Sequence, residues 1–456
     1  MLPDYFHSVT LDKDKCLGCT NCIKRCPTKA IRVQEGKARI FSERCIDCGE
    51  CIRVCPHHAK IAVCDTLDVL KKFEYTVALP APSLYAQVNN LESPATVVEG
   101  LKKIGFDDVF EVAKAAELIS DATRKLISSG KAPVPLISSA CPSISRLIRI
   151  RFPGLIEHLS PLLTPAELSA KLARQKAVEK TGLPPEKIGT VFISPCPAKA
   201  ASIKIPLGLD KSNIDAAIPV KEIYPLLVEA MPRTEDNSED AGSGRVGVRW
   251  GKTSGESHAL LSDSYLAADG IENCIKVLND LEDEKLNFIR FIELNSCPGG
   301  CVGGALQVEN PFVAKTKILS LTRYMPPFRN VIDGPDIPEE YYCSHELEYI
   351  PVMELDPDME KAFAKMDEID RLVKKFPGLD CGSCGSPSCR SLAEDIVRGY
   401  STEGACVFVL KDEVQQIANS LSRLTGGAPL FRGSGEGAAN AGGTSTDDKN
   451  TDEKKD

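Results

Sequence analysis

The chain has 456 residues, 19 of them cysteine, and a formal net charge of −9. Its length suggests two to four domains, and its acidity argues against nucleic acid as a partner. No apolar run approaches the roughly 20 residues that span a bilayer, and the start lacks a signal-peptide pattern, so we expect no membrane partner and a cytoplasmic location. There, cysteines more often bind metal or carry out chemistry than form disulfides.

The first predicted domain, residues 1–66, contains two copies of C-x2-C-x2-C-x3-C-P, CLGCTNCIKRCP at 16–27 and CIDCGECIRVCP at 45–56. This repeat is typical of bacterial ferredoxins with two [4Fe–4S] clusters, in which the fourth cysteine of each run binds the other cluster. One cluster is therefore predicted at Cys16, Cys19, Cys22 and Cys55, and the other at Cys45, Cys48, Cys51 and Cys26. A pair of zinc sites is the alternative, but zinc motifs rarely show this doubled run with both prolines.

The second predicted domain, residues 67–352, alternates strand-like apolar runs with amphipathic helical ones. In chain order these are YTVALPAP, VFEVAKAAELISDATRKLI, VPLISSAC, PAELSAKLARQKAVEK, TVFISPC and KEIYPLLVEAM. Such alternation predicts an α/β domain with mostly parallel strands.

Three strands of this domain are followed by cysteine beside proline, in SSACP, SPCP and NSCPGGC. In an open parallel sheet the carboxyl ends of the strands share one edge, where ligands bind. Cys141, Cys196, Cys297 and Cys301 are therefore expected to converge as four thiolates. Unrelated buried cysteines are the alternative, and the threefold repetition of the pattern argues against it.

The third predicted domain, residues 353–425, begins with a charged amphipathic helix over 357–376 that ends at Pro377-Gly378. The cysteines that follow have the spacing C-x2-C-x4-C-x16-C and are Cys381, Cys384, Cys389 and Cys406. They resemble the ligands of a single-cluster domain found in anaerobic electron-transfer proteins, although four cysteines could also hold zinc. Residues 426–456 are poor in large apolar residues and are predicted to be a disordered acidic tail.

The three middle loops resemble the signature segments of the catalytic domain of [FeFe]-hydrogenases, TSCCP, PCxxK and ExMxCxxGCxxGG. Here they read SSACP, PCPAK and ELNSCPGGCVGG, in the same order. The resemblance covers about residues 1 to 310 and points to a divergent branch with a sensory role. It implies that Cys141, Cys196, Cys297 and Cys301 hold the cubane of an H-cluster, with Cys301 bridging to a diiron unit that carries CO, cyanide and a dithiolate.

The resemblance also implies a set of residues around the diiron unit. Lys199 would hydrogen-bond one cyanide, and Ser83 the other. Residues implied to border the cofactor are Ala81, Pro82, Ser83, Ser194, Pro195, Lys199, Gly255 and Asn295. On sequence alone, Lys199 is otherwise a surface lysine, the Ala81–Ser83 segment a turn and Gly255 part of a helix cap.

Several positions depart from the family pattern. Ala140 replaces the cysteine that passes protons to the dithiolate amine, Ser194 and Asn295 replace methionines, and Ser143 replaces a glycine. Because a methyl group cannot carry a proton, we expect the bound cluster to survive but fast proton delivery to be lost.

Another proton route would need other titratable groups, and Glu256, Glu293 and His258 are the candidates. Glu256 also fits a capping box, since T-x-x-E begins at Thr253. Glu293 has a structural role as its alternative, and His258 is better explained as an ordinary helix residue.

These observations predict an iron-only hydrogenase that interconverts H2 with protons and electrons, turns over slowly and senses H2 or redox state. Its cofactors would be an H-cluster and three accessory [4Fe–4S] clusters, and its partners a ferredoxin or other redox protein and a signalling protein. The alternatives are a hydrogenase-like cluster carrier or assembly protein, with a plain [4Fe–4S] cluster and no diiron unit, and a pure electron-transfer protein. Cys64, Cys274 and Cys343 receive no role.

Overall fold

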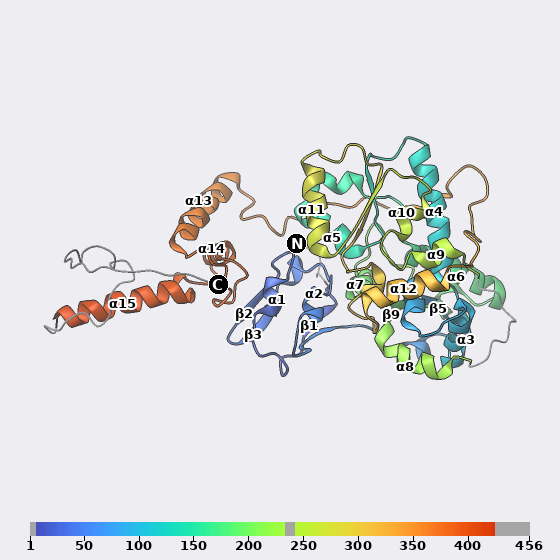
Figure 1. Ribbon diagram of the computed structural model, residues 1–456, viewed down its shortest axis with the longest axis horizontal. Coiled ribbons are helices and arrows are strands. Elements are labelled where there is room, and N and C mark those ends of the chain that lie inside the picture. Colours follow the sequence, from blue (N-terminus) through green and yellow to red (C-terminus); the bar gives the residue numbers. More distant parts are fainter. Residues whose placement is uncertain (1–5, 233–241, 425–456) are drawn as a thin grey trace, which may run out of the picture.

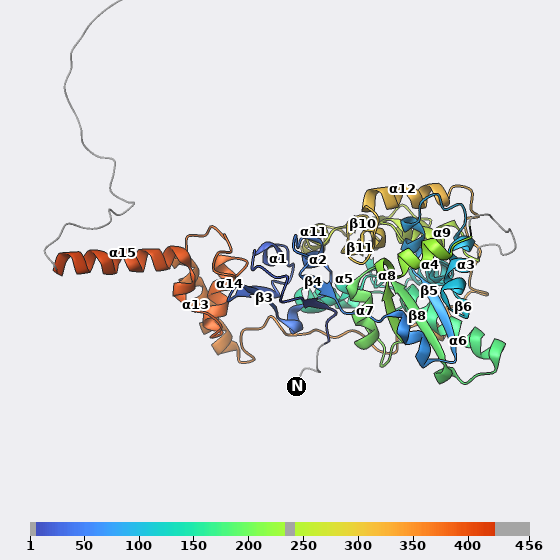
Figure 2. The same ribbon diagram turned by 90° about the horizontal axis from the view of Figure 1, so that it is seen from below.

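A computed structural model describes residues 6–232 and 242–424 of the chain. Three groups of elements follow one another along the long axis (Figures 1 and 2). The α/β domain lies at one end, the ferredoxin-like segment in the middle, and the cysteine-containing C-terminal helices at the other end. The predicted fold class is confirmed. The tail predicted over 426–456 lies outside the described residues.

The ferredoxin-like segment is built as two similar halves. Strand β1 (Val9–Leu11) pairs antiparallel with β4 (Lys60–Ala62), and β2 (Ile31–Gln34) pairs antiparallel with β3 (Lys37–Ile40). One short helix in each half carries the third cysteine of its run, α1 (Asn21–Lys24) and α2 (Glu50–Arg53).

The α/β domain contains two separate parallel sheets, whereas we expected a single sheet edge. The larger sheet has the order β6 (Asp108–Val109), β5 (Tyr75–Pro80), β8 (Ile188–Ser194) and β9 (Ala216–Pro219). The smaller has the order β10 (Tyr265–Asp269), β11 (Phe291–Asn295) and β7 (Leu136–Ile137). All these pairings are parallel. Hydrophobic alternation predicts strands but not which strands pair, so the division into two sheets was not predictable.

Helices cover both faces of the larger sheet. On β8, Val191 and Ile193 face α3 (Pro94–Ile104) and α8 (Val220–Ala230), whereas Ile188 and Phe192 face the alanine-rich side of α6 (Pro165–Thr181). Neighbouring residues of a strand point to opposite faces, so an entirely apolar strand is explained by burial on both sides.

Helix α4 (Val112–Ser128) joins the two sheets. Its first residue packs in the core of the larger sheet, while Ala115, Ile119 and Ala122 pack with Leu136 of the smaller sheet. The remaining helices of the domain are α5 (Pro142–Arg151), α7 (Pro197–Lys204), α9 (Arg245–Arg249), α10 (Gly255–Ala259), α11 (Ile271–Glu282) and α12 (Pro311–Leu321).

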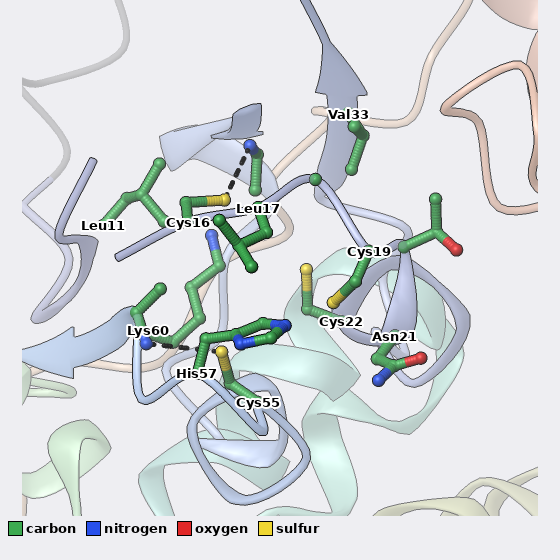
Figure 3. Close-up of a pocket in the computed structure, with 14 residues that line it drawn as sticks. Leu11, Cys16, Leu17, Cys19, Asn21, Cys22, Val33, Cys55, His57 and Lys60 are labelled. Carbon is green, nitrogen blue, oxygen red and sulfur yellow. Dashed lines mark hydrogen bonds between the residues drawn. The ribbon is translucent and has the colours of Figure 1, made fainter. Parts of the chain in front are cut away.

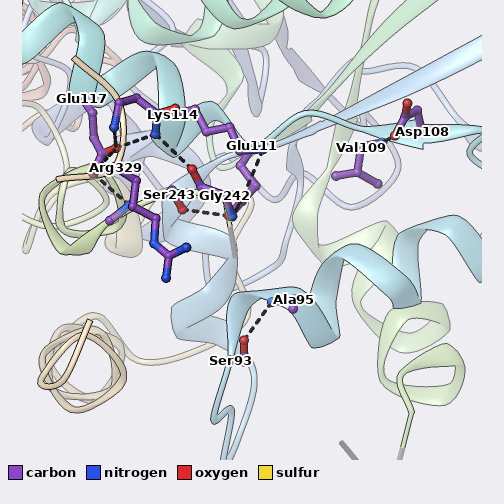
Figure 4. A network of polar contacts seen from close by, with 12 residues as sticks. Ser93, Ala95, Asp108, Val109, Glu111, Lys114, Glu117, Gly242, Ser243 and Arg329 are labelled. Carbon is purple, nitrogen blue, oxygen red and sulfur yellow. Dashed lines mark hydrogen bonds and ion pairs between the residues drawn. The ribbon is translucent and has the colours of Figure 1, made fainter. Parts of the chain in front are cut away.

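Two buried carboxylates of this region hold loops onto the domain (Figure 4). Glu111 accepts hydrogen bonds from the Gly242 amide and the Ser243 hydroxyl, both at 2.8 Å. Glu117 accepts from the Gly244 amide at 2.8 Å and from the backbone and side chain of Asn330. These bonds satisfy both the buried acids and the loop amides, so the polar groups support the fold at this position.

The C-terminal group consists of α13 (Met359–Lys375), α14 (Cys389–Val397) and α15 (Val407–Leu424). The helix predicted over 357–376 is therefore present. The group docks on the ferredoxin-like segment, where the buried Arg32 forms a two-pronged ion pair with Asp395, with Nη2 to Oδ1 at 2.9 Å. The Val33 amide also donates to the Gly385 carbonyl at 2.9 Å. None of the helices in the described part of the chain is both long and apolar enough to span a membrane.

Candidate metal centres

The eight ferredoxin-type cysteines gather in two pockets. The first, which we call site I, is lined by Cys16, Cys19, Cys22 and Cys55 (Figure 3). The second, site II, is lined by Cys26, Cys45, Cys48 and Cys51. In each pocket three cysteines come from one run and one from the other, which is the crossed arrangement expected from the repeat.

The thiols of these pockets are suited to metal binding. Burial raises the pKa of Cys51 to about 12 and that of Cys48 well above its ordinary value. Backbone amides donate to three of the sulfurs, from Ala30 to Cys26 Sγ at 3.2 Å, from Ala59 to Cys55 Sγ at 3.3 Å and from Ala38 to Cys16 Sγ at 3.4 Å. Protonated buried thiols are unreactive, but iron replaces the proton, and the amides then stabilise the sulfur charge.

The C-terminal cysteines form a third group. Cys384, Cys389 and Cys406 belong to one apolar cluster, and the pKa of Cys384 is raised by burial and then by the neighbouring Cys381 and Cys406. Glycine is required at residue 385 beside them, because a Cβ there would lie 1.8 Å from the Val33 carbonyl oxygen and φ is +82°. The third group therefore lies directly against the ferredoxin-like segment.

The α/β domain brings together its four cysteines from both sheets. Cys141 follows β7 and precedes α5, and Cys196 follows β8 and precedes α7. Cys297 follows β11, and Cys301 begins a short 3-10 helix, Cys301–Gly303. Since β8 belongs to one sheet and β7 and β11 to the other, the site lies where the two sheets approach each other.

Lys199 is the cation at the centre of this thiol group. Its Nζ donates to Cys301 Sγ at 3.5 Å. Burial alone would lower the pKa of Lys199, but the charges of Cys301, Cys196, Cys141 and Cys297 outweigh it and raise the pKa. All four sulfurs therefore lie close enough to act on one ammonium group, which is the arrangement that the sequence predicted.

Glycines allow the loop between Cys297 and Cys301 to pack tightly. A Cβ on Gly300, where φ is +90°, would lie 2.5 Å from the Thr253 amide nitrogen. A Cβ on Gly304 would lie 2.2 Å from the Pro195 carbonyl oxygen. The run PGGCVGG therefore reflects close backbone contact around the cysteines.

A cavity lies beside Cys301. Predicted site residues that line it are Ala81, Pro82, Ser83, Ala140, Pro195, Lys199, Glu256, Glu293, Asn295 and Cys301. Further lining residues that the sequence did not indicate are Val112, Ala116, Thr164, Pro165, Ala166, Phe192, Trp250 and Gly251. Except for Phe192, which lies on β8, they come from helices and loops that carry no metal-binding motif.

Two predicted residues lie elsewhere in the described structure. The Ser194 hydroxyl donates to the Cys196 carbonyl at 2.9 Å, so it stabilises the turn before the cysteine. Gly255 packs against the backbone of Arg249, where a Cβ would lie 2.0 Å from the carbonyl oxygen. The glycine in the cavity wall is Gly251, four residues earlier.

Ser83 is fully buried and held in place by Gln307. The Gln307 side-chain amide donates to Ser83 Oγ at 2.8 Å and to the Cys301 carbonyl at 3.2 Å. Because Ser83 Oγ accepts this bond, its own proton remains available to an acceptor in the cavity.

The capping box predicted at Thr253 is not formed. The Thr253 hydroxyl donates to Asp269 at 2.7 Å, and Glu256 accepts from Ser138 Oγ at 2.6 Å. Helix α10 is capped instead by Glu293, which accepts from the amides of Ser254 and Ser257, both at 2.9 Å. T-x-x-E spacing alone does not decide a cap, because tertiary partners compete for both side chains.

The two acids of the cavity affect each other. Burial, and then the charge of Glu293, raises the pKa of Glu256 to about 8. The pKa of Glu293 is also raised, mainly by burial, although its hydrogen bonds oppose this. Ser138 Oγ connects Glu256 to the Ala140 amide at 3.2 Å, so Glu256 rather than Glu293 is linked to residue 140.

The relay candidate His258 and the three cysteines without an assigned role do not line the cavity. His258 is exposed on α10, with Nδ1 2.5 Å from the Ser254 carbonyl oxygen. Burial raises the pKa of both Cys64 and Cys343 to about 11, and it also raises that of Cys274, whose thiol donates to the Asn295 carbonyl at 3.3 Å. Such thiols stay protonated and unreactive.

Arg53 connects site II to the cysteines of the α/β domain. Its guanidinium donates to the Cys48 carbonyl at 3.4 Å, to Cys297 Sγ at 3.6 Å and to the Gly303 carbonyl at 3.2 Å. The same side chain pairs with Glu50 at 2.9 Å. One cation therefore spans the boundary between two candidate clusters.

The fold and the cysteine sets define an iron–sulfur protein with a two-cluster ferredoxin segment and a four-cysteine α/β domain. Comparison with known families gives matches to the iron only hydrogenase large subunit, C-terminal domain, over residues 74–267 and 256–305, and to the 4Fe-4S dicluster domain over residues 8–56. Residues 376–408 match an Fe–S cluster family. The chain belongs to the iron-only hydrogenase family.

The chain has low sequence identity to two curated hydrogenases. It is 26% identical over 383 residues to the periplasmic [Fe] hydrogenase large subunit of Nitratidesulfovibrio vulgaris, covering 70% of this chain and 91% of the relative. It is 26% identical over 372 residues to iron hydrogenase 1 of Clostridium pasteurianum, covering 66% and 65%. A solved apo [FeFe]-hydrogenase from Chlamydomonas reinhardtii has 18% identity and a TM-score of 0.47 over 60% of this chain and 94% of that chain.

Proposed function

We propose that this protein is an iron-only hydrogenase that interconverts H2 with two protons and two electrons at an H-cluster. Four cysteines, Cys141, Cys196, Cys297 and Cys301, would hold the cubane, and Cys301 would also bind the diiron unit. The observation that carries the proposal is the half-buried Lys199, which contacts Cys301, is influenced by the charges of all four thiols and lines the adjoining cavity. An all-thiol donor set suits iron–sulfur chemistry, and the cavity offers polar donors that a plain cubane would not use.

Two residues would orient the cofactor. When bound, an H-cluster supplies the metal centre at which H2 is formed or split. Lys199 presents an ammonium group and Ser83 a hydroxyl proton to the same cavity, and both suit anionic ligands such as cyanide. The apolar wall, which includes Phe192 and Val112, excludes water and strengthens these contacts.

We propose that turnover is slow because the cavity lacks an efficient proton donor beside the cofactor. Ala140 contributes only a methyl group. Glu293 is engaged by the amides of α10, whereas Glu256, with its pKa near 8, can hold or release a proton at the oxygen that does not accept from Ser138. Ala140→Cys should change turnover only modestly, because the new thiol would enter a cavity whose other groups have also changed. A return to fast turnover, measured per assembled H-cluster, would contradict this explanation.

Infrared spectroscopy tests the central proposal. Protein matured with the diiron cofactor should show bands from bound CO and cyanide, and Lys199→Met should shift the cyanide bands. Absence of these bands at full iron loading would favour the alternative, a cluster carrier or assembly protein with a plain cubane.

We propose that electrons travel along the chain of sites. Residues 1–66 would carry two clusters, residues 67–352 the H-cluster and residues 353–425 a third accessory cluster. Arg53 connects site II to Cys297, and Gly385 places the third group against β2, so the sites follow one another in space. This order would connect the H-cluster to a ferredoxin or other redox protein.

A sensory role needs a partner, and α15 offers a surface for one. Its side chains at Val407, Leu410, Val414, Ile417 and Leu424 are between 46% and 84% exposed. The first four are spaced by three, four and three residues and Leu424 follows seven residues later, which is the pattern of helices that pack against another helix. We propose that a signalling protein binds this helix, and Leu410→Ser with Ile417→Ser should then abolish binding while leaving H2 turnover unchanged.

A further inference from the structure

The two halves of the ferredoxin-like segment differ at one buried position. The sequence after the fourth cysteine of each run reads CPTKAI at 26–31 and CPHHAK at 55–60. The halves agree in structure, because the alanine amide of each donates to its cysteine sulfur at 3.2 and 3.3 Å. The next residue, however, is Ile31 in one half and Lys60 in the other, and both are only 3% exposed.

Lys60 is a buried lysine at site I. Its Nζ has no hydrogen-bond partner within the part of the chain that the structure describes. The residue begins β4 and lines site I together with Cys22 and Cys55 (Figure 3). No carboxylate lies among the residues that line this pocket.

An ammonium group in such a place requires a compensating negative charge. Burying an unpaired charge is strongly unfavourable, so isolated buried lysines are rare. Four thiolates around a [4Fe–4S] core carry net negative charge in both oxidation states and would compensate Lys60. Lys60 already acts on a thiol of site I: burial raises the pKa of Cys22, and the charge of Lys60 opposes that rise. The orphaned amine therefore indicates that site I fits an anionic cluster.

We propose that Lys60 raises the reduction potential of the cluster at site I above that of the cluster at site II. One electron converts [4Fe–4S]2+ to [4Fe–4S]+ and adds a negative charge; no bond breaks and no proton moves. The ammonium stabilises this extra charge at site I, whereas site II has Ile31 in the matching position. Lys60 also acts on Cys51 of site II, so both potentials rise, but the shift is larger at the pocket that Lys60 lines.

Because of this difference in potential, an electron in the relay would reduce the cluster at site I in preference to the cluster at site II. The C-terminal group contacts the helix that carries Cys22 of site I, since a Cβ on Gly382 would lie 3.5 Å from Ile23 of α1. Site I is therefore the ferredoxin site that the C-terminal group approaches at α1. An electron leaving the α/β domain would thus be held at site I before transfer to the C-terminal site. The inference rests on the ferredoxin clusters and does not require the diiron unit.

The test is a redox titration followed by electron paramagnetic resonance on the full chain, reconstituted to about 16 irons and reduced with dithionite. Cys19→Ala, which removes a ligand of site I, assigns the signals. In Lys60→Met we expect the site I cluster to become at least tenfold less reduced relative to oxidised at a fixed potential, a shift of about 59 mV for one electron. The site II shift should be smaller.

Two matched variants isolate the buried charge. Lys15→Met removes a surface lysine next to Cys16. The Lys15 side chain is 59% exposed and paired with Asp12, so this change should leave both potentials unchanged. Lys60→Arg keeps the charge and should stay close to the unmodified protein. If Lys60→Met does not retain the site I cluster, Lys60→Ile, which copies the other half, is measured by the same criterion.

The proposal is overturned if the site I potential is unchanged in the loaded neutral variant, or if both potentials fall equally. A shift in Lys60→Arg as large as that in Lys60→Met would also overturn it. Absence of CO and cyanide bands in the infrared experiment bears on the hydrogenase proposal alone, so the two ideas fail separately.

Discussion

Replacing Glu293 with glutamine is expected to loosen α10 by removing part of its cap. The carboxylate accepts four hydrogen bonds of 2.9 Å, two at each oxygen. One oxygen receives the Ser254 amide and the Asn295 side chain, and the other receives the amide and hydroxyl of Ser257. Glutamine offers one accepting oxygen and one NH2 group. The Ser257 hydroxyl and the Asn295 amide can rotate to match it, but a backbone N–H cannot, so one buried amide loses its acceptor.

The loss of a charge-assisted bond to a buried backbone amide costs about 1.5–3 kcal/mol. Local opening of α10 should become more frequent in proportion, roughly 10- to 100-fold, because every 1.4 kcal/mol is a factor of ten. Hydrogen exchange of the Ser254 and Ser257 amides measures this directly in the cluster-loaded chain.

Glu256→Gln provides the matched control, since glutamine keeps an oxygen to accept from Ser138 and these amides make no bond to Glu256. Exchange at Ser254 and Ser257 should be unchanged in this variant. Equal protection of both amides in Glu293→Gln and the unmodified protein would refute the capping role. A large loss of turnover in Glu293→Gln at equal H-cluster loading and unchanged exchange would instead support a proton relay through this residue.

Three further predictions concern pH, the cofactor and domain docking. Because the pKa of Glu256 is raised from 4.5 to about 8, the folded state keeps a proton that the unfolded chain releases; its contribution to stability is complete below about pH 4.5 and is lost as pH rises through 8. Thermal midpoints at pH 5.5 and 8.5 should therefore differ less in Glu256→Gln, and an unchanged difference would argue against the shifted pKa. Cys301→Ala should lose the infrared bands of bound CO while keeping the paramagnetic signals of the accessory clusters; retained CO bands would contradict its bridging role. Arg32→Met should leave Asp395 buried and unpaired at a cost of about 3–5 kcal/mol, so limited proteolysis should release the C-terminal helices faster; equal rates would show that the ion pair does not hold them.

The cysteine sets were predictable because their ligands are fixed by local spacing. Within a run such as CLGCTNCIKRCP the spacing brings three cysteines together, and the repetition of the run indicates that the fourth cysteine of each set comes from the other run. The Cys-Pro pattern after three strands likewise gave the four cysteines that surround Lys199. The order of strands and helices followed from hydrophobic periodicity, and the helix at Met359–Lys375 agrees with its charge pattern and its Pro-Gly end.

The rest depended on contacts between residues far apart in the chain. The contact of Arg53 with Cys297 joins positions that no local pattern relates. The sequence could not decide between the roles open to Glu256, because Ser138, more than a hundred residues away, donates to the carboxylate that a capping box would need. Gly251 lines the cavity instead of Gly255 because tertiary packing places it there.

The placement of the four thiols on two sheets has a consequence for the lifetime of the protein. Cys196 belongs to the end of β8, and Cys141 and Cys297 to the ends of strands in the other sheet, so a cubane bound to them would act as a covalent cross-link between the two sheets. Cross-links limit the freedom of the unfolded chain, and ligand binding to the native state alone stabilises it. Oxidative loss of the cluster would therefore remove a cross-link together with a redox centre. We expect the damaged chain to open between its sheets and to be degraded faster than the intact one, so that molecules that have lost this redox centre would also be the ones removed.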